Sequence, residues 1–134
     1  MKYSVVIHKE KDSCFGVTVP DIVGCFSAGD TLESALRNAE EAIYSHLEIL
    51  ADDGEFAPVP LSIDNHFNNP DFAGGSWAYV DIDTSAFLGK TEKATVTLPK
   101  LLIDKIDEAV AHGLAKSRSA FLAESASKRL SGGL

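Results

Sequence analysis

The segment KATVTLP, residues 93–99, contains the pattern that determines how the C-terminal third of the chain folds. Polar lysine and threonine alternate with apolar alanine, valine and leucine as far as Leu98, which is the two-residue period of a β-strand with one apolar face. Pro99 then ends the strand, because proline has no backbone N–H to donate, and it stands where a helix can begin. The segment predicts one strand that leads directly into a helix.

Two short helices are predicted after this strand. The first ends at His112-Gly113, since glycine readily adopts the left-handed conformation that closes a helix. Ser117 is then the N-cap of the second helix. Apolar residues recur at helical spacing in both, namely Leu102, Ile103, Ile106, Ala109 and Val110 in the first and Phe121, Leu122, Ala126 and Leu130 in the second.

This strand-helix-helix unit is predicted to form a dimer. A unit of about forty residues rarely buries enough surface by itself, and a lone strand lacks a partner for its backbone hydrogen bonds. Two chains that pair their strands antiparallel about a two-fold axis would solve both problems. We expect a dimer core that contains Ala94, Val96, Leu98, Ile106 and Phe121.

The run from Glu92 to Leu130 resembles the ribbon-helix-helix family, in which a two-stranded ribbon enters the major groove of DNA. The resemblance implies that Lys93, Thr95 and Thr97 face outward and read base edges. It also implies that Ser117, Arg118 and Ser119 hold a DNA phosphate, a role that suits the N-terminus of a helix.

The front part of the chain predicts an α+β sheet domain of order β-β-β-α-β-β. Alternating residues in 3–8 and 15–19 indicate a hairpin, and residues 22–27 a third strand. A long helix with one apolar stripe follows and ends at Gly54. Strands are then expected near residues 61–63 and 77–83.

The sequence also predicts how the long helix begins and what state the two cysteines are in. Asp30 with Glu33 three positions later fits a capping box. Cys14 and Cys25 lie in predicted strands and lack CxxC spacing, so we expect two buried thiols and no disulfide. Because no secretory signal or apolar membrane segment is evident, the protein is expected in the cytoplasm.

Charge is distributed unevenly along the chain. Residues 1–90 contain five Lys and Arg against fifteen Asp and Glu, a net charge of −10, whereas residues 91–134 contain seven against five, a net charge of +2. The acidic part would attract a basic protein, and the back part could approach DNA. We therefore predict two domains, 1–84 and 92–131, with a linker at 85–91 and a tail at 132–134.

The segments FGVTVPD (15–21), GCFS (24–27) and GDTLESA (29–35) resemble the signature of HicB-type antitoxins. The resemblance implies a partial ribonuclease-H-like N-terminal domain joined to a DNA-binding module. It also implies a partner, a small basic HicA-type toxin that cleaves mRNA and that the antitoxin covers, and a complex that represses its own operon. The acidic domain is then the toxin-binding part, although its contact residues are not identified, and the protein is a homodimer, or a tetramer if the sheet domains also associate.

Two alternatives to this interpretation come from other classes of protein. A nuclease needs several converging carboxylates, but only Asp81 and Asp83 share a strand face, so an enzyme is not expected. A ligand- or metal-responsive ribbon-helix-helix repressor remains the second hypothesis. No cofactor or metal is predicted, because no two histidines have helical metal-ligand spacing; the four are His8, His46, His66 and His112.

Overall fold

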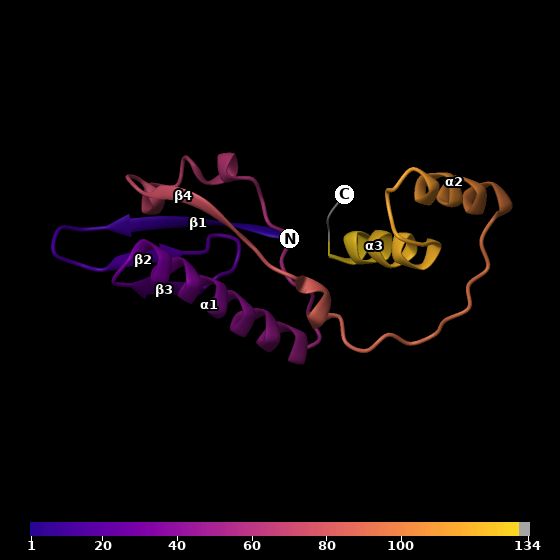
Figure 1. Cartoon of the computed structure of the whole chain (residues 1–134), viewed down its shortest axis with the longest axis horizontal. Coiled ribbons are helices and arrows are strands. Elements are labelled where there is room, and N and C mark those ends of the chain that lie inside the picture. Colours follow the sequence, from indigo (N-terminus) through magenta and orange to yellow (C-terminus); the bar gives the residue numbers. More distant parts are fainter. Residues whose placement is uncertain (132–134) are drawn as a thin grey trace. The chain divides into compact units, whose positions relative to one another are not determined.

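The computed structural model describes residues 1–131, which form two compact units (Figure 1). The first unit is Met1–Gly89 and the second begins at Lys90. This division falls within residues 85–91, where the linker is predicted. The predicted tail, residues 132–134, lies outside the described residues.

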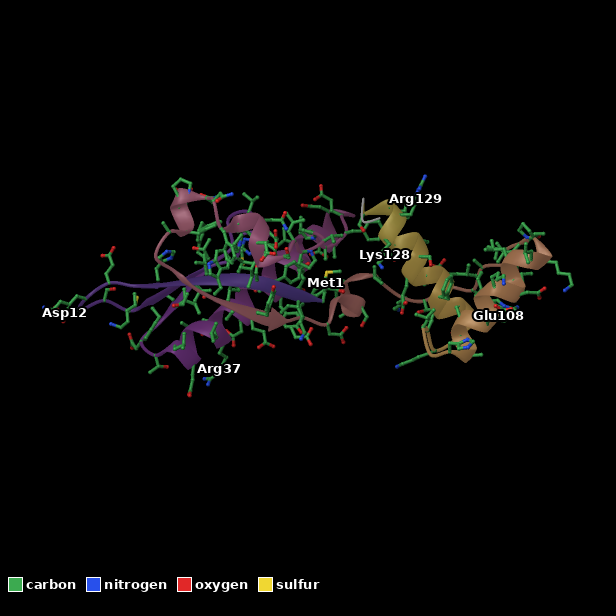
Figure 2. The ribbon with its side chains drawn as sticks, turned by 90° about the horizontal axis from the view of Figure 1, so that it is seen from above. Met1, Asp12, Arg37, Glu108, Lys128 and Arg129 are labelled. Atoms are coloured by element: carbon green, nitrogen blue, oxygen red, sulfur yellow. The ribbon has the colours of Figure 1, made fainter. Side chains whose placement is uncertain are left out.

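The first unit contains a four-stranded antiparallel sheet in the order β3-β2-β1-β4. Its strands are β1 (Lys2–Lys9), β2 (Phe15–Thr18), β3 (Phe26–Gly29) and β4 (Ser76–Asp81). The predicted hairpin of β1 and β2 is confirmed, and Asp12 lies at its tip with a φ of 64° (Figure 2). The first strand is central in the sheet because β4 pairs along its other edge.

The helix α1 (Leu32–Asp52) covers one face of this sheet (Figure 1). Four of its residues are buried at four-residue spacing: Ala35, Ala39, Ile43 and Leu47. They pack against the apolar side chains of β1, including Tyr3 and Val5. Burial of a side chain such as Ile43 or Leu47 stabilises the fold by about 1.5–3 kcal/mol. The predicted helix and its end are confirmed, since Gly54 has a φ of 78° and follows the last turn directly.

The capping box lies one residue later than predicted for Asp30 and Glu33. Thr31 is the N-cap, and its hydroxyl accepts a hydrogen bond from the backbone N–H of Ser34 at 3.1 Å. The Ser34 hydroxyl accepts the reciprocal bond from the backbone N–H of Thr31, also at 3.1 Å. Both orphan N–H groups are thus satisfied by the Thr31–Ser34 pair, which leaves Glu33 free to point into solvent.

A long connection after α1 packs against Trp77. Trp77 lies on the sheet face opposite α1, because Ala78 and Val80 of the same strand pack in the core under the helix and neighbouring strand residues point to opposite faces. It contains two short 3₁₀ helices, η1 (Ile63–His66) and η2 (Pro70–Phe72). The His66 ring stacks on Trp77 with centroids 6.0 Å apart, and Phe72 meets Trp77 edge-on at 5.7 Å. The Nε2 atom of His66 also lies 3.0 Å from Oδ1 of Asp21. Contacts to both the sheet and the β2–β3 turn therefore hold this connection in place.

The strand predicted near residues 61–63 is wrong. The backbone N–H of Leu61 donates to the Asp21 carboxylate at 3.1 Å, and η1 begins two residues later. Pro58 and Pro60 remove two of the donors that a strand ladder would need. The connection therefore finds its hydrogen bonds in a side chain and in 3₁₀ turns, and the unit has the order β-β-β-α-β.

Two smaller predictions in the β2–β3 region also need correction. The third strand begins at Phe26 instead of Ile22, because the Cys25 N–H bonds to the Ile22 carbonyl at 3.1 Å and closes a tight turn. Cys25 is buried as expected, but Cys14 is exposed because it lies between the hairpin turn and the start of β2. Both thiols are free.

Up to residue 131, the second unit contains two helices, α2 (Lys100–Ala111) and α3 (Arg118–Leu130), which pack against each other. The predicted helix end at Gly113 is confirmed, with a φ of 84°. The last turn of α3 carries Lys128 and Arg129, whose positive charges favour that end of a helix (Figure 2). Residues 93–98, predicted as a strand, have no regular secondary structure in this single chain.

Candidate functional site

The predicted base-reading residues lie on an exposed segment directly before α2. Lys93, Thr95 and Thr97 are all exposed, and α2 begins immediately after Pro99 as predicted. The apolar residues that alternate with them are also uncovered, since 62% of the surface of Val96 is exposed and Ala94 is exposed. A strand ladder here requires a second chain, so the ribbon remains a prediction.

The apolar surface of the second unit is largely unburied. Among its described residues, Ile106 is the one hydrophobic side chain that is fully buried, while Phe121 and Leu98 are half-buried. Between residues 90 and 131, five large hydrophobic side chains are exposed: Val96, Leu101, Leu102, Leu114 and Leu130. The hydrophobic core of this unit is therefore unusually small. Burial of its exposed apolar side chains against another protein surface would stabilise it.

The predicted phosphate-binding residues lie at the N-terminus of α3. Ser117 is the N-cap as predicted, and its hydroxyl accepts a hydrogen bond from the backbone N–H of Ala120 at 3.1 Å. Ser119 is exposed within the first turn. The N-terminus of this helix therefore keeps its positive end at the surface, where an anion could approach.

Arg118 has a partner that the sequence did not indicate. Its Nε donates to Oδ1 of Asp107 at 3.0 Å, and its Nη2 donates to Oδ2 at 2.8 Å. These hydrogen bonds lower the pKa of the Asp107 carboxyl and raise the pKa of the Arg118 guanidinium. The pair links α2 to α3, so a phosphate at Arg118 would share or displace the Asp107 carboxylate. The eleven-residue separation follows no helical period that could have revealed it.

The residues considered for metal binding or nuclease chemistry lie apart or have other partners. Asp81 lies beside the terminal amino group of Met1, at 3.4 Å. Asp83 accepts hydrogen bonds from the hydroxyl and the backbone N–H of Ser85, which lower its pKa. Within residues 1–131, no group of three or more His, Cys, Asp or Glu side chains is arranged to hold a metal ion.

In the described part of the chain, no helix has the length and apolar character needed to cross a membrane.

Comparison with known proteins defines the class of this molecule. Residues 3–126 match the family model described as HicB_like antitoxin of bacterial toxin-antitoxin system. The protein is thus an antitoxin and not an enzyme. More particularly, the chain belongs to the HicB-like antitoxin family, as the resemblance of residues 15–35 predicted.

Three similar proteins illustrate this membership. An uncharacterized 14.9 kDa protein from the rep-hol intergenic region of Haemophilus phage HP1 is 42% identical over 97% of this chain and 98% of its own. The crystal structure of the Burkholderia pseudomallei antitoxin HicB is 37% identical, with a TM-score of 0.76 over 97% of this chain and 98% of that one. A chain in the HicA3 and HicB3 toxin-antitoxin complex is 36% identical, with a TM-score of 0.53 over 62% of this chain and 99% of that one.

Proposed function

We propose that this antitoxin binds and neutralises an mRNA-cleaving toxin of the HicA type through residues 1–84. We further propose that residues 92–131 form a ribbon-helix-helix homodimer that binds operator DNA and represses the operon of the pair. No cofactor takes part in either activity.

The observation that carries toxin binding is the 36% identity to a chain in the HicA3 and HicB3 toxin-antitoxin complex. The charge of residues 1–90, five Lys and Arg against fifteen Asp and Glu, supports the same partner. A toxin that acts on RNA needs a positive surface, and an acidic domain is complementary to it. Such a domain would also compete with RNA for that surface.

The exposed apolar side chains of the second unit support dimerisation. Val96 and Leu101 expose 62% and 70% of their surfaces in the single chain, and a pair of ribbons beneath four helices would cover side chains of this kind. The exposed Lys93 and Thr97 would then be carried on the outer face of the ribbon. The positive end of α3 at Ser117 supports the accompanying phosphate contact.

Toxin neutralisation is tested in cells that express the toxin encoded by a reading frame next to this gene. Induction of the toxin alone should stop growth, and co-expression of this chain should restore it. Growth arrest that persists despite normal levels of folded antitoxin would contradict the proposal. Recovery would support it, provided that the two proteins also co-purify.

Operator binding is tested by gel-shift titration with DNA from upstream of the gene. Thr97→Ala and Lys93→Ala should each weaken specific binding by about 1–3 kcal/mol, the usual value of a base contact. Thr91→Ala is the matched control, because Thr91 is also exposed but precedes the predicted ribbon. Equal operator affinity in all three variants would refute base reading by this strand.

A further inference from the structure

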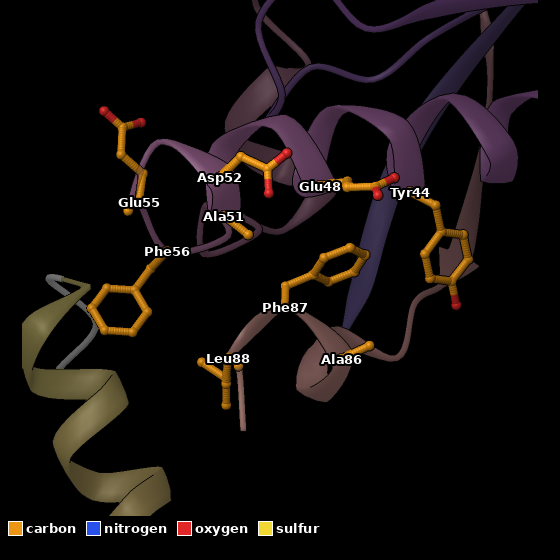
Figure 3. Close-up of a pocket in the computed structure, with 11 residues that line it drawn as sticks. Tyr44, Glu48, Ala51, Asp52, Glu55, Phe56, Ala86, Phe87 and Leu88 are labelled. Atoms are coloured by element: carbon orange, nitrogen blue, oxygen red, sulfur yellow. The ribbon is translucent and has the colours of Figure 1, made fainter. Parts of the chain in front are cut away.

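A surface pocket of about 720 Å³ lies in the first unit beside the C-terminal half of α1. One wall comes from α1 and the residues after it, and the other from η3 (Thr84–Phe87) and the two residues that follow (Figure 3). Glu48 and Asp52 project from the helix on the side that faces Phe87. The lining is both acidic and aromatic, which restricts what the pocket can bind.

Three carboxylates line this pocket, those of Glu48, Asp52 and Glu55, and no Lys, Arg or His does. None of the three side chains takes part in a hydrogen bond or ion pair with the described part of the chain. Glu48 and Asp52 lie near the C-terminus of α1, and the last turn of this helix carries no basic residue. Carboxylates there face the negative end of the helix dipole and one another, so an incoming cation would relieve two unfavourable interactions.

The walls between the carboxylates are apolar and aromatic. Tyr44 and Phe87 lie with ring centroids 5.9 Å apart, and Phe56 and Leu88 expose 43% and 57% of their surfaces. Aromatic faces attract organic cations, and a guanidinium stacks on them while its apolar stem lies along the wall. A hydrated metal ion would gain little from such walls, and a nucleic-acid phosphate would be repelled by the carboxylates.

We propose that this pocket receives an arginine or lysine side chain of the protein partner, with Glu48 and Asp52 as its counter-charges. The proposal rests on the proposed toxin binding and names its contact site, which the sequence left unidentified. This site extends past residue 84 to Phe87 and Leu88, which belong to the same compact unit. The cation supplies the positive charge that the end of α1 lacks, and its stem packs between Phe56 and Phe87. Toxin binding and RNA exclusion then follow from one contact.

The test is calorimetric titration of the full-length antitoxin with the neighbouring toxin, inactivated by substitution. Glu48→Gln with Asp52→Asn should weaken binding about tenfold or more, because it removes both counter-charges. The same double variant should melt at an equal or higher temperature without toxin, since it relieves repulsion at the helix end. Glu40→Gln with Glu41→Gln is the matched control, because both are exposed on α1 outside the pocket and the charge change is equal. This control should bind the toxin within about twofold of the unchanged protein.

The titration distinguishes failure of the proposed toxin binding from failure of the proposed pocket contact. If the unchanged protein does not bind toxin, toxin neutralisation itself fails; if it binds and both double variants bind equally well, only the pocket assignment fails. Phe56→Leu tests the aromatic wall in the same way and should weaken binding severalfold while the melting temperature is retained. If the pocket variant altered self-association of the antitoxin without toxin, the occupant would be a second copy and the proposal would be overturned.

Discussion

The change Val96→Ala separates the folding of one chain from the assembly of two. In the single chain 62% of the Val96 surface is exposed, so removal of its methyl groups should leave the free energy of unfolding of an isolated chain nearly unchanged. In the proposed dimer both copies are buried under the helices. Each copy then loses two methyl groups worth about 0.8 kcal/mol apiece, so the dimer is weakened by about 3 kcal/mol and its Kd rises about 100-fold.

Sedimentation equilibrium over a range of concentrations measures this Kd directly. Val23→Ala is the matched control, because Val23 lies in the first unit and 95% of its surface is exposed. It should leave the Kd unchanged. An unaltered Kd in Val96→Ala, with the protein still dimeric, would show that the dimer forms through another surface and that residues 93–98 are not its core.

Three further changes test other parts of the molecule. Arg118→Ala should reduce the slope of log affinity against log salt by about one for each DNA phosphate that the arginine neutralises, and an unchanged slope would leave Arg118 as a link between helices only. Burial raises the pKa of Tyr3 to about 12, so its contribution to stability is present below pH 10 and is lost between pH 10 and 12, by about 2–3 kcal/mol. Urea unfolding at pH 9 and 11 should show about half of this loss, roughly 1.4 kcal/mol, in the unchanged protein and not in Tyr3→Phe, because pH 11 lies midway between the two pKa values. Equal changes in both proteins would contradict it. Gly29→Ala should cost about 1–3 kcal/mol because a Cβ there meets the backbone of Ala35, whereas in Gly16→Ala the nearest atom is 3.8 Å away and unfolding should change much less.

Much of the first unit could be predicted from residue patterns. The stripe of α1 is set by one buried face, so the period of 3.6 residues is visible in the sequence. The two-residue period of the β1–β2 hairpin is also visible, although β1 is buried on both faces from Tyr3 to Ile7. The helix ends at Gly54 and Gly113 were predictable because glycine readily adopts the left-handed backbone. The connection over Trp77 was not, since its hydrogen bonds to Asp21 join residues forty or more positions apart in the sequence.

Some features of the candidate sites could likewise be predicted from the sequence, and others could not. Ser117 was identified as a cap because an N-cap is a local feature with a strong residue preference. The Asp107 partner of Arg118 and the pocket of Glu48, Asp52 and Phe87 arise only when separate elements pack together. The proposed ribbon would need a second chain for its hydrogen bonds, so the structure of a single chain does not test it.

Neutralisation of a toxin is the central claim, and its most direct measurement is RNA cleavage in vitro. The purified toxin from the neighbouring reading frame is incubated with a labelled mRNA while the antitoxin is added stepwise. We expect cleavage to fall in proportion to antitoxin and to stop once the toxin is saturated, and we expect Glu48→Gln with Asp52→Asn to require more protein for the same inhibition. Cleavage that continues unchanged in a large excess of folded antitoxin would contradict toxin neutralisation by this chain.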